Sequence, residues 1–183
     1  MKLEEFVHFL ADERDFDLRG YKPTTLERRI RKRMSRLAVS DYEAYIEYIQ
    51  ASPGETSQLL DTILINVTEF FRDPGAWDVI AGHVLPYLLK RLRTGDSFRA
   101  CVAGCSTGEE VYSPAILVAE HLGPRISEFD IKIYATGVGE AALNVARRGE
   151  YPPERLRRVR LEWRHKYLSP AALAVQTGIS AAC

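Results

Sequence analysis

The chain has 183 residues, of which 46% are hydrophobic and 27% are charged, a composition typical of a folded globular protein. Lysines and arginines number 25, as do aspartates and glutamates, so no overall charge attracts the molecule to nucleic acid or to anionic lipid. No stretch is apolar enough to span a bilayer, and the acidic start MKLEEFVHFLADERD is unlike a signal peptide, so we expect a cytoplasmic location. Three irregularly spaced cysteines and four scattered histidines indicate free thiols and no metal site.

The first third of the chain is predicted to be helical, because its apolar residues recur at spacings of three and four. The first two apolar stripes consist of Leu3, Phe6, Val7 and Leu10, and of Leu26, Ile30, Met34 and Leu37. No alternating β-type run interrupts this region. We therefore expect a small all-helical domain over residues 1–70, with the domain boundary within residues 66–76.

The densest cluster of charge lies on the second predicted helix, within the run KPTTLERRIRKRMSRL. The basic residues that matter for recognition are Arg28, Arg29, Lys32, Arg33 and Arg36. Such a stripe beside an apolar face can bind an acidic helix or a nucleic acid backbone. It can equally be a solvated helix face, as most charge runs are. A second basic stretch, residues 155–166, is predicted to face solvent.

The pattern changes in the second half, where two β-α units follow one another. SFRACVAG precedes STGEEVYSPAILVAEHLG, and FDIKIYAT precedes GVGEAALNVARRG. Two successive units of this kind predict parallel strands with crossover helices over residues 71–183. The tail SPAALAVQTGISAAC supplies no clear further strand. The expected fold is thus an all-helical domain followed by a truncated Rossmann-like α/β domain.

The turn AGCSTGEE lies where ligands bind in open α/β sheets, at the carboxyl end of a strand and the amino end of a helix. Gly104 and Gly108 allow close approach of the backbone to a ligand, and Glu109 and Glu110 add acceptors. The acids disfavour a phosphate and favour a cofactor with an ammonium group and a ribose. The alternative is a tight turn whose acids stabilise the helix dipole.

The segment NVTEFFRD lies at the junction of the two halves and contains Asn66, Thr68 and Arg72. If it is helical, Thr68 and Arg72 share one face and can point at one ligand. The alternative is a connector between domains, with a buried aromatic pair and a solvated arginine.

Taken together, the basic helix, NVTEFFRDPGAW, AGCSTGEEVYS and IYATGVGEAALNVARRGEY resemble the chemotaxis receptor methyltransferase (CheR) family over most of residues 1–168. The resemblance implies S-adenosylmethionine as cofactor, S-adenosylhomocysteine as product, and methylation of glutamates on chemoreceptor helices. It assigns cofactor contacts to Asn66, Thr68 and Glu110, and to Arg72 a place near the reaction centre. It also implies that residues 28–36 recognise acidic receptor helices.

The chain departs from the family pattern at two places. Gly137 stands where the family has an aspartate that binds the ribose, so cofactor binding is expected to be weakened. After Leu168 the family's further strands and cofactor segments are missing, which suggests truncation. Two alternatives therefore stay open: an inactive binding module that docks on acidic helices, and an RNA or small-molecule methyltransferase.

Overall fold

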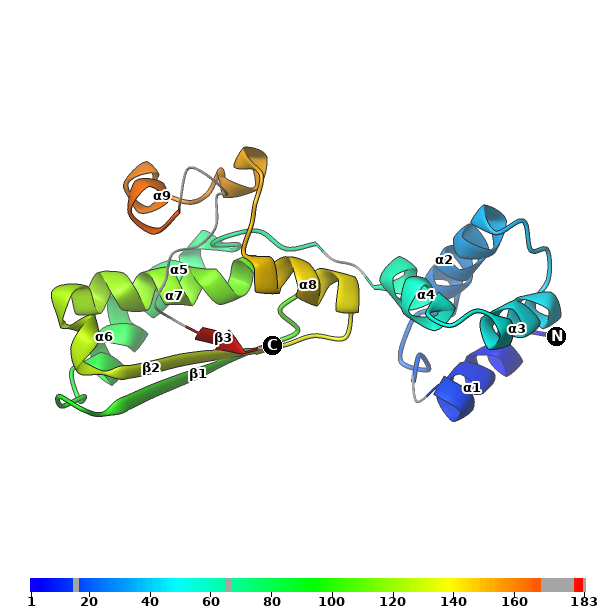
Figure 1. Cartoon of the computed structure of the whole chain (residues 1–183), viewed down its shortest axis with the longest axis horizontal. Helices are drawn as coiled ribbons and strands as arrows, with labels where there is room; N and C mark the ends of the chain where they lie inside the picture. The colour runs from blue at the N-terminus through cyan, green and yellow to red at the C-terminus, as the bar shows by residue number, and fades with distance from the viewer. Residues whose placement is uncertain (15–16, 65–66, 169–179, 183) are drawn as a thin grey trace. The chain divides into compact units, whose positions relative to one another are not determined.

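The computed structural model describes residues 1–14, 17–64, 67–168 and 180–182. Contacts divide the chain into two compact units, Met1–Ile65 and Asn66–Cys183 (Figure 1). The sequence places this boundary after residue 70, whereas the contacts place it between Ile65 and Asn66. Among the described helices, none is long and apolar enough to cross a membrane.

The described residues of the first unit form four helices: α1 (Leu3–Arg14), α2 (Pro23–Arg36), α3 (Tyr42–Ala51) and α4 (Glu55–Ile63). Proline is tolerated at the start of α2 because its missing N–H would have no partner there. At α3, the Asp41 carboxylate accepts the backbone N–H of Ala44 at 2.9 Å, which satisfies a free donor of the first turn. The helices enclose one apolar core of Phe6, Val7, Leu10, Leu18, Leu26, Ile30, Met34, Tyr42, Tyr45, Ile49, Leu59 and Ile63. The predicted all-helical domain is confirmed.

The second unit begins with a helical stretch made of α5 (Pro74–Val79), the π-helical turn η1 (Ile80–Val84) and α6 (Leu85–Leu89). The β-α units follow as β1 (Ser97–Ala103), α7 (Glu109–Leu122), η2 (Gly123–Glu128), β2 (Asp130–Thr136) and α8 (Glu140–Arg148). Among the described residues that follow, two short helices and a short strand are formed: η3 (Pro153–Leu156), α9 (Leu161–Tyr167) and β3 (Ser180–Ala182). The predicted α/β domain is confirmed.

The three strands form a parallel sheet in the order β1-β2-β3. Ala103 pairs with Thr136, so the carboxyl ends of β1 and β2 are level. The prediction that the tail supplies no further strand is wrong, because Ser180–Ala182 pairs with β2 from Lys132 to Tyr134. A parallel ladder is made by backbone groups, so a segment of small residues can join it without an alternating side-chain pattern.

Helix α7 is the central core element of the second unit. Ten of its fourteen residues are buried, and Pro114 does not end the helix. On β2, which contacts α7, the buried residues Ile131, Ile133 and Ala135 alternate with more exposed ones. A helix that is buried nearly all round fixes its own first turn firmly, and that turn carries the motif predicted to bind the cofactor.

Candidate active site

The glycine turn joins β1 to α7 and occupies residues 104–108. The backbone N–H of Cys105 donates to the carbonyl of Thr136 at 2.7 Å, which ties the turn to the end of β2. Gly104 and Gly108 have φ angles of 73° and 95°, and Ser106 has a φ of 49°. Left-handed conformations are easy for glycine but strained for serine, so the surrounding structure must hold this turn in place.

Gly108 is enclosed, whereas Gly104 is open. A Cβ atom on Gly108 would lie 2.7 Å from the Tyr151 hydroxyl and 2.8 Å from the Cβ of Ala146. A Cβ on Gly104 would meet nothing within 4 Å. Packing therefore requires glycine at position 108, because a Cβ would clash there. Gly104 instead leaves free space at the strand end, as a ligand-binding turn requires.

Glu109 is fully buried beneath the turn, and its carboxylate is satisfied by side chains. The Thr107 hydroxyl donates to it at 2.6 Å, and Arg155 Nη1 donates to its other oxygen at 2.6 Å. The Tyr151 hydroxyl donates to the Thr107 carbonyl at 2.6 Å. Burial, and then the Glu109 carboxylate, raise the pKa of the Tyr151 phenol. Glu109 is thus an internal anchor of the turn.

Glu110, the next residue, is exposed and faces a cavity of about 210 Å³. The cavity is lined by Glu69, Arg72, Asp73, Trp77 and Glu110. Three carboxylates, one guanidinium and one indole suit a ligand with cationic groups, a flat ring and a carboxylate of its own. The cofactor named by the resemblance carries a sulfonium, an ammonium, a carboxylate and a purine, so this donor set fits it.

Arg72 reaches the cavity from an irregular segment, and the idea of a helix over residues 68–72 is wrong. Phe71 and Asp73, on either side of Arg72, have positive φ angles of 51° and 57°. The backbone N–H of Phe71 donates to the Ser113 hydroxyl at 3.0 Å, and that hydroxyl donates to the Glu109 carbonyl at 2.8 Å. The segment is therefore fastened to the first helical turn of α7, which also carries Glu110.

The aromatic pair of the same segment is buried, as expected for an anchor. The Phe71 ring packs against Trp77 and Trp163, with centroid separations of 5.6 Å and 5.2 Å. The Phe70 ring meets Tyr151 edge to face at 5.0 Å. These contacts hold the backbone just before Arg72, whose own guanidinium is exposed and donates to the Val67 carbonyl at 3.1 Å.

Gly137 directly follows β2, so it lies beside Gly104 at the level carboxyl ends of the two strands. A Cβ on Gly137 would lie 3.0 Å from Leu143 Cδ2 and 3.7 Å from Cys105 Sγ. The first contact is with the end of a flexible side chain. The position can therefore accept a larger residue after a small shift of Leu143.

The predicted site residues fall into separate groups. Arg72 and Glu110 line one cavity, and Gly104 and Gly137 lie at neighbouring strand ends. Thr68 is half-buried, and Asn66 lies outside the described residues. A larger cavity of about 500 Å³ shares Trp77 with the smaller one, but none of the predicted cofactor residues lines it. The smaller cavity is therefore the candidate site.

Several residues of the site escaped the sequence analysis. Glu69, Asp73 and Trp77 lie within the motif NVTEFFRDPGAW, so their place in the chain was a usable signal. Arg155 gave no such signal. Its side chain is 43% exposed, in keeping with the prediction that residues 155–166 face solvent, although its guanidinium also binds Glu109. Lys166 is likewise exposed, at 57%, and binds the Glu120 carboxylate at 2.7 Å.

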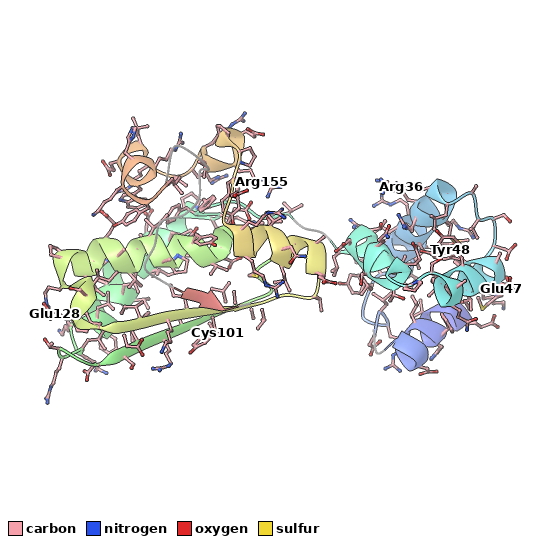
Figure 2. All side chains as sticks on the ribbon, viewed as in Figure 1. Arg36, Glu47, Tyr48, Cys101, Glu128 and Arg155 are labelled. Carbon is pink, nitrogen blue, oxygen red and sulfur yellow. The ribbon has the colours of Figure 1, made fainter. Side chains whose placement is uncertain are left out.

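The basic residues of α2 fall into two groups, one that binds other residues of the helical unit and one that is exposed. Arg29 donates to the carbonyl of Ile63 at 2.8 Å, and Arg33 binds the buried Glu55 carboxylate through Nε at 2.8 Å. These two guanidinium groups stabilise the helical unit internally. Arg28, Lys32 and Arg36 are exposed, and Figure 2 labels Arg36 near the end of α2. The predicted partner-binding charges are thus available at three of the five positions.

The second unit has a parallel sheet, a glycine turn and an acid-rich cavity at the start of α7, and a helical domain precedes it. These features define a cofactor-binding α/β protein with an added helical module. Comparison with known proteins gives the family. Residues 66–182 match the CheR methyltransferase SAM binding domain, and residues 1–64 match the CheR methyltransferase all-alpha domain. The chain belongs to the CheR methyltransferase family, and S-adenosylmethionine is the cofactor of its second domain.

Curated relatives share this assignment. The chain is 28% identical over 172 residues to a chemotaxis protein methyltransferase of Borreliella burgdorferi, covering 92% of the chain and 61% of the relative. It is 30% identical over 160 residues to a chemotaxis protein methyltransferase of Listeria monocytogenes, covering 87% and 59%. A third, from Listeria innocua, is 32% identical over 146 residues, covering 80% and 53%. The chain therefore spans just over half the length of these relatives.

Proposed function

We propose that the chain binds S-adenosylmethionine in the cavity lined by Arg72 and Glu110, as part of a cytoplasmic enzyme that methylates glutamate side chains of chemoreceptor helices. The observation that carries this proposal is that Arg72 and Glu110, from motifs far apart in the sequence, line one acid-rich cavity at the amino end of α7. Family membership supports the same reaction.

The cofactor, when bound, supplies an electrophilic methyl group on a sulfonium. The protein's residues have the task of holding it and aligning the acceptor. Glu110 and Asp73 offer carboxylates for cationic or hydroxyl groups, and Gly104 leaves room above the strand end. Thr68 and Asn66 belong to the proposed cofactor set through the family motif.

A glutamate acceptor requires no general base, because a carboxylate with a pKa near about 4.3 is already ionised at neutral pH. The protein must instead place the acceptor oxygen in line with the methyl group, within roughly 3 to 3.5 Å. Arg72 is the cation of the cavity and can orient the acceptor carboxylate. Its placement depends on Ser113, which holds the backbone of Phe71.

Calorimetry with S-adenosylhomocysteine tests the cofactor site directly. Glu110→Gln removes one charge from the cavity and should weaken binding by roughly ten- to a hundredfold. Glu162→Gln is the matched control, because Glu162 is 72% exposed and lies outside the cavity. Equal affinities of the two variants would mean that the cofactor binds elsewhere. If the folded chain does not bind S-adenosylhomocysteine at all, the proposed function is wrong.

The proposed partner is an acidic receptor helix that binds the exposed charges of α2. Reversing Lys32 and Arg36 to glutamate should abolish salt-sensitive binding to a receptor cytoplasmic fragment, because both charges are exposed. The control is reversal of Arg148 and Arg157, two exposed arginines of the second unit. If α2 is only a solvated face, the two double variants will bind the fragment equally well.

A further inference from the structure

Arg155, which Figure 2 labels, lies in η3, 46 residues after Glu109, yet its guanidinium binds Thr107 of the glycine turn. Nη1 donates to the Glu109 carboxylate at 2.6 Å and to the Thr107 hydroxyl at 3.0 Å. The Glu109 side chain is 0% exposed, and that of Arg155 is 43% exposed. A buried carboxylate without a cation beside it is costly, and Arg155 supplies that cation for Glu109.

The turn needs this support, because its backbone is strained. Ser106 adopts a positive φ between two glycines that do the same, and such conformations persist only where neighbouring groups fix them. Arg155 and Glu109 hold the side chain of Thr107, and Tyr151 holds its carbonyl. Tyr151 and Arg155 therefore hold Thr107 of the turn through its carbonyl and its hydroxyl.

We propose that Arg155 is a positioning residue of the methyl-transfer site. It acts through Glu109 and Thr107 to hold the glycine turn so that Gly104 borders the free space and Glu110 faces the cavity. This inference rests on the proposed function, since it concerns the same site. It assigns a role in cofactor binding to a residue that touches no residue of the cavity lining in the contacts described here.

The test compares Arg155→Gln with Arg157→Gln, which changes an exposed arginine two residues further on. Binding of S-adenosylhomocysteine is measured by calorimetry well below the melting temperature of every variant, where a purely structural role would leave the dissociation constant unchanged. We expect Arg155→Gln to weaken binding at least about tenfold, because a small displacement of the turn misplaces several contacts at once. Arg157→Gln should bind as the unaltered chain does.

A double variant tests whether Arg155 acts through Glu109. In Arg155→Gln the carboxylate is left unpaired, and adding Glu109→Gln removes that buried charge. The double variant should therefore regain part of the lost affinity. An affinity no better than that of Arg155→Gln, or an unaltered affinity in folded Arg155→Gln, would overturn the proposal.

Hydrogen exchange separates failure of this inference from failure of the proposed function. The amides of Cys105 and Gly108 donate to the carbonyls of Thr136 and Cys105 at 2.7 Å and 2.9 Å. Their exchange should be at least about tenfold faster in Arg155→Gln than in Arg157→Gln if Arg155 holds the turn. If the unaltered chain binds no S-adenosylhomocysteine, the proposed function fails, and equal exchange in both variants would then refute the role of Arg155 as well.

Discussion

Alanine substitutions at Gly108 and Gly104 should affect the second unit in different ways. Both glycines have positive φ angles, 95° and 73°, so an alanine at either position is strained. Only at Gly108 would the new Cβ also clash, at 2.7 to 2.9 Å from Tyr151 and Ala146. Comparing the two alanine variants thus separates the effect of backbone strain from that of overpacking within one turn.

The expected losses of unfolding free energy follow from backbone strain and from overpacking. Left-handed backbone costs a non-glycine residue roughly 1–2 kcal/mol, which is the whole effect predicted for Gly104→Ala. Overpacking adds about 1–3 kcal/mol at Gly108, because two of the clashing atoms belong to Ala146 on α8 and cannot rotate away. The free energy of unfolding of the second unit should therefore fall by roughly 2–5 kcal/mol in Gly108→Ala.

Tryptophan fluorescence during urea unfolding is a suitable assay, because the two tryptophans of the chain, Trp77 and Trp163, both belong to the second unit. It reports the unfolding of that unit even if the helical unit unfolds separately. Equal losses in Gly108→Ala and Gly104→Ala would refute the packing argument. Calorimetry adds a second contrast: Gly104→Ala should weaken cofactor binding in the folded state, since its methyl group enters the free space.

Three further predictions concern single charges. Arg72→Ala should abolish methyl transfer to a receptor fragment and leave the circular dichroism spectrum unchanged; transfer at the level of an Arg157→Ala control would remove Arg72 from the reaction centre. Gly137→Asp should tighten S-adenosylhomocysteine binding by roughly ten- to a hundredfold once Leu143 has shifted, whereas Gly137→Asn should gain less; equal gains would contradict a charge-assisted contact. Burial raises the pKa of Glu55, but hydrogen bonds from Arg33 and Tyr45 outweigh burial and leave the pKa below its usual 4.5. Because the pKa is lowered by folding, this carboxylate stabilises the helical unit above about pH 4.5, and the stabilisation is lost as the pH falls through the folded-state pKa. Hydrogen exchange of residues 1–64 should therefore depend less on acid pH in Glu55→Gln than in the control Glu47→Gln, and equal dependence would show that Glu55 contributes none of it.

The helical unit was predictable because the spacing of apolar residues within short stretches of chain indicates its helices. Leu26, Ile30 and Met34 recur at helical spacing, and all three are buried on one face of α2. The two β-α units were predictable for the same reason, since a β-type run, a glycine turn and a helical run follow one another directly. Strand β3 was missed because its pairing is decided by the neighbouring backbone of β2.

The site was predictable only in part. Motif residues such as Arg72 and Glu110 could be named from the sequence, but the irregular backbone that carries Arg72 could not. Phe71 and Asp73 have positive φ angles there. Phe71 is held by Ser113 and by its ring contacts with Trp77 and Trp163, and no local propensity indicates such a segment.

By itself, the sequence determined the two-part architecture, the all-helical character of the first part, the two β-α units of the second, the family resemblance and the motif residues of the site. All of these depend on spacings within short stretches of chain. Only the tertiary structure decided that Glu109 is an internal anchor while Glu110 faces the cavity, and that Arg155 binds beneath the turn. The physical reason is that burial and ion pairing depend on which segments meet in space. The family motif names Glu110, but only the folded chain brings Arg155, 46 residues away, to the carboxylate of Glu109.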